Sequence, residues 1–149
     1  MLKTKQIFVL ALAACLALAH AADSTPSEPA SSWQSQAQKE IKANNYSGAI
    51  KTLEAANQSN SADWNNLLGY AQRKKSPPDL AAAERFYLAA LKIDPKHRGA
   101  LEYYGELLLM KNDLAGAEQM LARLDKACVF SCEEFRDLKE AIASFKSKK

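Results

Sequence analysis

The stretch LLGYAQRKKSPPDLAAAERFYLAALKIDPKH, residues 67–97, contains the pattern that decides the fold of this chain. Apolar residues recur at helical spacing on both sides of the Ser76-Pro77-Pro78 segment. The paired prolines cannot continue a helical ladder of hydrogen bonds, so they separate two helices. Asp94-Pro95 then ends the second helix. The stretch therefore predicts a helical hairpin.

Small and bulky residues of this hairpin recur elsewhere in the chain. Ala49, Ala83 and Ala117 follow one another at intervals of 34 residues. The same interval relates two further sets: Leu53, Tyr87 and Leu121, and Ala56, Ala90 and Leu124. In the preceding helices Ala37, Gly69 and Gly105 are spaced by 32 and 36 residues. We interpret the Ser76-Pro77-Pro78 turn as a two-residue insertion that explains this difference.

A helix–turn–helix period of this length is similar to that of the tetratricopeptide repeat (TPR) family. The chain resembles the family over about residues 30–131. The second repeat matches best, at Leu68-Gly69, Ala83, Tyr87, Ala90 and Pro95. The first repeat keeps Trp33, Ala49, Leu53 and Ala56 but has Ala37 where the family has glycine. The third repeat keeps Gly105, Ala117 and Leu121, has Leu124 in place of the second alanine and lacks the closing proline.

The resemblance implies an all-α fold, a right-handed α-solenoid of three helix-turn-helix repeats at about 30–61, 62–97 and 98–131. Residues 132–149 then form a capping helix and a basic tail. The stripes of apolar residues predict helices over about 33–41, 49–56, 64–75, 80–93, 100–110, 114–127 and 132–145, the third ended by the Ser76-Pro77-Pro78 segment. No segment shows the two-residue alternation of a strand. We expect Trp33 and Trp64 to lie in the core, because the family buries a large residue at these positions.

Residues 1–21 have the pattern of a signal peptide. Lys3 and Lys5 precede an almost unbroken apolar run of 13 residues, 7–19, and Ala19-His20-Ala21 supplies a cleavage site. The run is shorter than the roughly 20 residues of a membrane span. Residues 22–30 are small, polar and rich in proline, which is typical of a flexible linker.

Cys15 allows a different processing route. Leu12-Ala13-Ala14-Cys15 resembles the lipobox of bacterial lipoproteins, in which the cysteine is acylated. The apolar run continues beyond Cys15, whereas a lipobox normally ends it. We therefore expect an exported, periplasmic protein, and the alternatives are a lipoprotein anchored at Cys15 or a secreted protein. Contact with a membrane is expected only if Cys15 is lipidated.

Once Cys15 is removed, Cys128 and Cys132 remain, and an even number of cysteines in an exported protein predicts a disulfide. Within one helix, residues four apart have Cβ atoms about 5–6 Å apart, too far for a disulfide at about 3.8 Å. A turn between the cysteines removes this obstacle. The Ser131-x-x-Glu134 pattern predicts a capping box and a helix beginning at Cys132. The alternative is a thiol or metal function at the two cysteines.

Neither an enzyme nor a nucleic-acid-binding protein is expected. Without Lys3 and Lys5 the chain has 18 basic and 17 acidic residues, too balanced for sequence-independent binding of phosphates. His97 is the one histidine after the signal segment, and it is expected to be a solvated loop residue with no catalytic partners. No glycine-rich phosphate loop is present. We predict no catalytic residue, metal or cofactor.

The TPR resemblance implies that the first helix of each repeat lines a concave groove. It assigns the partner-binding residues Lys42, Asn66, Tyr70, Arg73, Lys74, Glu102 and Glu106, with Gln34, Gln38, Leu109 and Met110 beside them. The expected function is that of a non-enzymatic protein–protein interaction module or adaptor of the cell envelope, which binds a segment of a protein or peptide partner. The alternative is a structural envelope component that uses its convex face or its cap.

Overall fold

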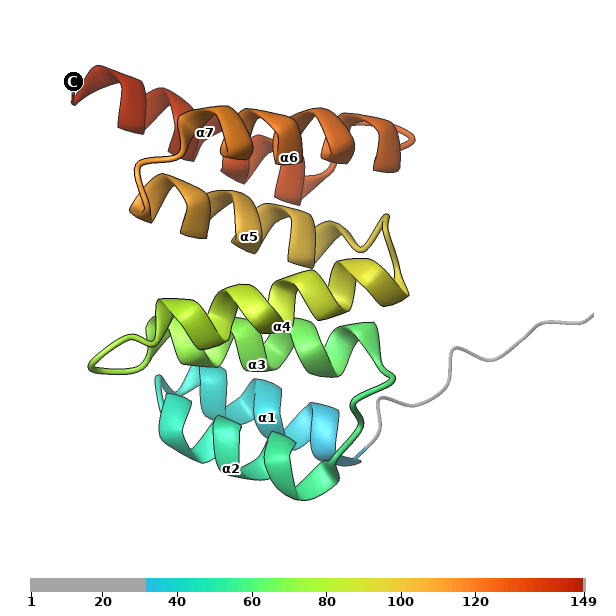
Figure 1. Cartoon of the computed structure of the whole chain (residues 1–149). Coiled ribbons are helices and arrows are strands. Elements are labelled where there is room, and N and C mark those ends of the chain that lie inside the picture. Colours follow the sequence, from blue (N-terminus) through green and yellow to red (C-terminus); the bar gives the residue numbers. More distant parts are fainter. Residues whose placement is uncertain (1–31, 149) are drawn as a thin grey trace, which may run out of the picture.

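The computed structural model describes residues 32–148, and this part of the chain folds into seven α-helices without a strand (Figure 1). The helices are α1 (Ser32–Lys42), α2 (Tyr46–Ala56), α3 (Ala62–Lys74), α4 (Leu80–Ile93), α5 (Arg98–Met110), α6 (Leu114–Ala127) and α7 (Glu133–Ser147). The all-α prediction is confirmed. The predictions for the signal segment 1–21, Cys15 and the linker 22–30 lie outside the described residues.

Short polar side chains fix where the helices begin. Asn45, Ser61, Asp79 and Asp113 each accept a hydrogen bond from the backbone amide three residues ahead. Such caps satisfy amide groups that have no partner inside the helix. The polar turns of the sequence therefore act as helix boundaries, as their composition predicts.

The capping box predicted at Ser131 is wrong. Helix α7 begins at Glu133, and its N-cap is Cys132, which makes no side-chain capping hydrogen bond. Ser131 thus lies one residue outside the capping position. Cys132 instead forms a disulfide with Cys128, with the sulfurs 1.99 Å and the Cα atoms 5.8 Å apart. The predicted bond across the turn is present, and we call residues 128–132 the cap loop.

Consecutive helices contact each other from α1 and α2 at one end to α6 and α7 at the other (Figure 1). Three pairs form, α1 with α2, α3 with α4 and α5 with α6, while α7 packs on both α5 and α6. Helix α1 also contacts α3, and α3 contacts α5. The first helices of the three pairs therefore form one continuous surface, which we call the first-helix face.

Small residues allow the close packing of these helices. A Cβ atom added at Gly69 would lie 2.6 Å from the ring of Tyr87, and one added at Gly105 would lie 2.6 Å from Leu138. The alanines of the 34-residue pattern, Ala49, Ala83 and Ala117, are fully buried. The recurring small residues thus lie at buried positions, and at Gly69 and Gly105 a side chain of another helix packs directly against the backbone.

Both tryptophans contribute to the core, as predicted. Trp64 is buried, and its indole nitrogen donates a hydrogen bond of 2.6 Å to the carbonyl oxygen of Leu53. Trp33 is half-buried against the same cluster, which also contains Leu68 and Ala37. This contact joins α3 to the first helical pair.

Replacing Gly69 by valine should destabilise the fold, because the new side chain would overlap the ring of Tyr87. We expect the free energy of unfolding to fall by about 1–3 kcal/mol. The matched control is Ala81→Val, at an exposed position of α4, which introduces the same β-branched residue without the overlap. Urea unfolding measures both, and an equal loss in the two variants would contradict the packing argument.

Candidate functional site

A hollow of about 320 Å³ lies on the first-helix face. Its lining residues come from three first helices: Gln38, Ile41 and Lys42 of α1, Leu67 and Tyr70 of α3, and Tyr103 of α5. Apolar and aromatic side chains thus lie beside one exposed cation, Lys42. Concave surfaces with this mixture are typical of binding sites in proteins.

Tyrosine rings and one guanidinium group pack together along one side of this hollow. The ring centroids of Tyr70 and Tyr103 are 4.8 Å apart, and Tyr46 lies 6.3 Å from Tyr70. The guanidinium of Arg73 lies 5.6 and 5.7 Å from the ring centroids of Tyr70 and Tyr103. Burial raises the pKa of the Tyr70 hydroxyl, so this group is neutral at physiological pH.

Arg73 is itself fixed by the fold. Its Nε donates a hydrogen bond of 3.3 Å to the hydroxyl of the buried Tyr87, and its terminal nitrogen pairs with Glu106 at 2.6 Å. The side chain of Arg73 is 8% exposed. Arg73 therefore packs against Tyr70 and Tyr103 while two of its five N–H groups are hydrogen-bonded inside the protein.

The residues that the resemblance assigned to the groove fall into four groups. Lys42, Tyr70 and Gln38 line the hollow, and Lys74 and Met110 are exposed outside it. Arg73 and Glu106 form the ion pair described above, and Gln34 donates a hydrogen bond of 3.3 Å to Asp63. Asn66, Glu102 and Leu109 are buried.

Sequence reasoning missed three residues of the hollow, Ile41, Leu67 and Tyr103. A signal for two of them was present, because Leu67 and Tyr103 are 36 residues apart, the same interval that separates Gly69 from Gly105. They therefore occupy the same position in consecutive first helices. Tyr103 also contributes to the core, where it packs against the cluster that contains Tyr87.

Glu102 is a buried carboxyl group on the same face. Burial raises its pKa to about 8, and the neighbouring carboxylates of Glu106 on α5 and of Asp137 and Glu134 on α7 act in the same direction. Arg73 on α3 opposes this rise. Glu102 thus keeps its proton under conditions in which an ordinary glutamate is charged.

This shift predicts that Glu102 makes the fold less stable as the pH rises. The folded state binds the proton up to a pH of about 8, whereas an unperturbed glutamate releases it near 4.5. The folded state therefore holds more protons between these values, and the free energy of unfolding falls with increasing pH. Glu102→Gln should raise the melting temperature at pH 9 and leave it nearly unchanged at pH 4.

The control for this prediction is Glu54→Gln on α2, which changes an exposed glutamate in the same way. Thermal unfolding followed by circular dichroism gives the melting temperature of each variant across the pH range. A stabilisation by Glu102→Gln that is equal at pH 4 and pH 9 would contradict the assignment of the raised pKa to this carboxyl group.

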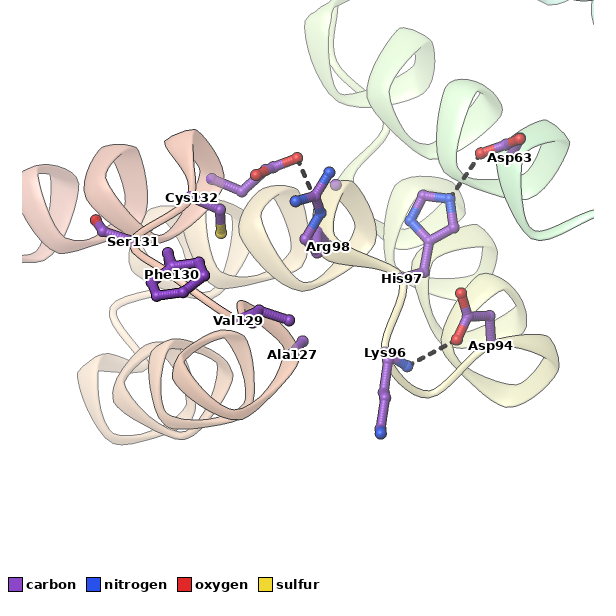
Figure 2. Close-up of a pocket in the computed structure, with 12 residues that line it drawn as sticks. Asp63, Asp94, Lys96, His97, Arg98, Ala127, Val129, Phe130, Ser131 and Cys132 are labelled. Atoms are coloured by element: carbon purple, nitrogen blue, oxygen red, sulfur yellow. Dashed lines mark hydrogen bonds and ion pairs between the residues drawn. The ribbon is translucent and has the colours of Figure 1, made fainter. Parts of the chain in front are cut away.

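A second hollow, of about 780 Å³, opens between the α4–α5 turn and the cap loop (Figure 2). His97 and Asp63 form a contact of 2.9 Å at one side, and Arg98 pairs with Glu134 at 3.5 Å. Val129 and Phe130 extend from the cap loop and are 89% and 88% exposed. Two large apolar side chains are thus presented to solvent by a loop that a disulfide closes.

The prediction that His97 is a solvated loop residue is wrong. Its side chain is 13% exposed, and its Nδ1 accepts a hydrogen bond of 3.0 Å from the backbone amide of Ala100. The Asp94-Pro95 turn places His97 at the N-cap of α5, where its ring closes the first turn and its Nε2 reaches Asp63. The histidine therefore helps to fix the junction of α3 and α5.

Between residues 32 and 148, no group of three or more His, Cys, Asp or Glu side chains is arranged to hold a metal ion. Within the same range, no helix has the length and apolar character needed to cross a membrane.

Comparison with known proteins does not identify a family for this chain. No protein-family model matches this chain, and no curated protein matches it significantly.

Proposed function

We propose that this protein is a non-enzymatic interaction module that binds a segment of a partner protein on its first-helix face. The observation that supports the proposal is the hollow built by α1, α3 and α5. Its apolar residues, Ile41 and Leu67, adjoin the aromatic rings of Tyr70 and Tyr103. Such a surface fits one or two apolar side chains of an extended or helical peptide.

The aromatic side chains along one side of the hollow are held in position before a ligand binds, and this favours binding. Tyr70 already contacts Tyr46, Tyr103 and Arg73, so a ligand does not have to order this ring. Binding surfaces with rigid aromatic side chains lose less conformational entropy on association. Tyrosine is also among the residues whose truncation most often weakens a protein interface.

The proposal includes a TPR-type architecture, a right-handed α-solenoid of three repeats with α7 as its cap. The 34-residue interval and the contacts of Gly69 with Tyr87 and of Gly105 with Leu138 support it. A helical pair cannot bury its apolar surface alone, so stacked pairs and a cap with polar outer residues are needed. In this architecture the first-helix face is the concave groove.

We further propose that the protein works in the periplasm as part of the cell envelope. The basic and apolar pattern of residues 1–21 supports export. The disulfide between Cys128 and Cys132 supports the same conclusion, because such bonds persist in oxidising compartments.

The intact mass of the exported protein distinguishes the two processing routes. We expect a chain that begins at Ala22, because the apolar run and the cleavage site extend past Cys15. Mass spectrometry of the protein from the envelope fraction gives this mass directly. An acylated chain that begins at Cys15 would be heavier by the seven residues 15–21 and by its acyl groups, and would indicate a lipid-anchored module instead.

Peptide selection tests the binding function. Random dodecapeptides displayed on phage are selected on the oxidised protein, and the affinity of the enriched peptides is measured by fluorescence anisotropy. We expect Tyr70→Ala to weaken binding by about tenfold or more, because it removes the central ring of the hollow. Arg85→Ala, at an exposed position of α4, serves as the control and should change the affinity less than about twofold.

The exposure of Val129 and Phe130 favours a second candidate, in which the protein attaches to an envelope assembly through the cap loop. The same selection separates the two functions. Peptides whose affinity is unaffected by Tyr70→Ala but lost in the double variant Val129→Ser/Phe130→Ser would contradict binding at the first-helix face and support the cap loop instead.

A further inference from the structure

The disulfide of the cap loop lies at the surface of the protein. Cys128 is the C-cap of α6 and Cys132 is the N-cap of α7, and both residues are half-buried. The three residues between them, 129–131, are exposed. A disulfide in the core is shielded from thiols, whereas an exposed one is open to exchange with them. The position of this bond therefore permits chemistry that a core disulfide does not.

The two sulfurs of the bond differ in their surroundings. Cys132 lines the larger hollow, together with Phe130 and Arg98, and Cys128 does not line it (Figure 2). The hollow has a volume of about 780 Å³, within the range of pockets that hold small ligands. It therefore has room for a cysteine side chain and part of the segment that carries it. A thiol that enters the hollow reaches the disulfide from the side of Cys132.

The start of α7 also suits a sulfur that takes part in exchange. Helix α7 has 15 residues, and the side chain of its N-cap, Cys132, makes no capping hydrogen bond. Amide groups at the start of a helix stabilise an anion such as a thiolate. Glu133 and Glu134 act in the opposite direction, but they lie 3.9 Å from Arg136 and 3.5 Å from Arg98. These two cations offset the carboxylates next to the sulfur.

Two apolar side chains stand beside the disulfide. Val129 and Phe130 are 89% and 88% exposed, whereas the other exposed large apolar residues among 32–148 reach at most 49%. Both line the larger hollow, and neither belongs to a core cluster. Exposed apolar groups that do not stabilise the fold are typical of contact surfaces. They favour a thiol whose neighbours are apolar over a small, charged thiol such as glutathione.

We propose that the cap loop is a thiol–disulfide exchange site that captures a partner protein through a cysteine with apolar neighbours. The partner's thiolate attacks Sγ of Cys132 and forms a new S–S bond with it. The bond between Cys132 and Cys128 breaks, and its electron pair leaves with Sγ of Cys128, which takes up a proton from water. The partner's thiol is thereby oxidised and Cys128 is reduced. Attack of the Cys128 thiolate on Cys132 reverses the capture. This site lies outside the hollow of the first-helix face and does not depend on it.

Trapping of the mixed disulfide tests which sulfur is attacked. The oxidised, exported protein reacts at pH 8 with the acetylated tripeptide amide Leu-Cys-Phe, N-ethylmaleimide blocks all free thiols, and peptide mapping by mass spectrometry locates both adducts. We expect the tripeptide on Cys132 and the maleimide on Cys128 with a preference of about tenfold or more. The cyclic peptide of residues 128–132 lacks the hollow and α7, and its preference should be less than about threefold.

Reaction rates test the nature of the partner. Three thiols are compared: the Leu-Cys-Phe peptide, the matched Gly-Cys-Gly peptide and glutathione, each relative to its rate with the cyclic peptide. The wild-type protein should prefer the apolar peptide about tenfold over the other two, and Val129→Ser/Phe130→Ser should reduce this preference to less than about twofold. Leu88→Ser removes a half-exposed apolar side chain on α4 and should retain the full preference.

Three results would overturn the proposal. A disulfide with a purely structural role would exchange only in unfolded molecules, so its rate would follow the unfolded fraction in urea and vanish in the folded protein. Tripeptide found on Cys128, or equally on both cysteines, would contradict attack at Cys132. A wild-type protein that reacts with glutathione as fast as with the apolar peptide would contradict capture of a partner protein.

Discussion

The contact between Gly69 and Tyr87 connects the packing of this protein to its candidate site. The glycine lets the ring of Tyr87 lie against α3, where a Cβ atom would be 2.6 Å from it. The hydroxyl of the same ring then accepts a hydrogen bond from Arg73. Arg73 in turn holds Tyr70 and Tyr103 on the first-helix face. A close approach inside the core thus determines the positions of the aromatic rings at the surface.

The first-helix face combines two kinds of chemistry at one place. Its hollow offers apolar and aromatic surface, while Asn66 and Glu102 on the same helices are buried polar side chains. Both features follow from helical stacking, because the same successive helices supply the two sets of residues. The cap loop, which the disulfide between Cys128 and Cys132 closes, provides a separate exposed apolar surface at Val129 and Phe130.

The candidate site was predicted only in part. The repeat pattern located the helices of the site and pointed to Lys42 and Tyr70, which line the hollow. It also grouped Arg73 with surface residues, although this side chain is buried and paired with Glu106. Which residues of a helix face a neighbour depends on how far the helices are rotated against each other, and sequence intervals do not give this rotation. His97 was misjudged for a related reason, because its capping role depends on the position of α3.

The sequence by itself determined that the described chain is helical, where each helix begins and ends to within a few residues, and which cysteines pair across the last turn. Local signals fix these features, since periodicity, prolines and polar caps act within a few residues of the backbone. The tertiary structure decided that Glu102 is buried, that Arg73 pairs with Glu106 inside the protein and that Tyr103 lines the hollow. Burial and pairing of side chains depend on contacts between residues far apart in the chain, and these exist only once the helices are packed.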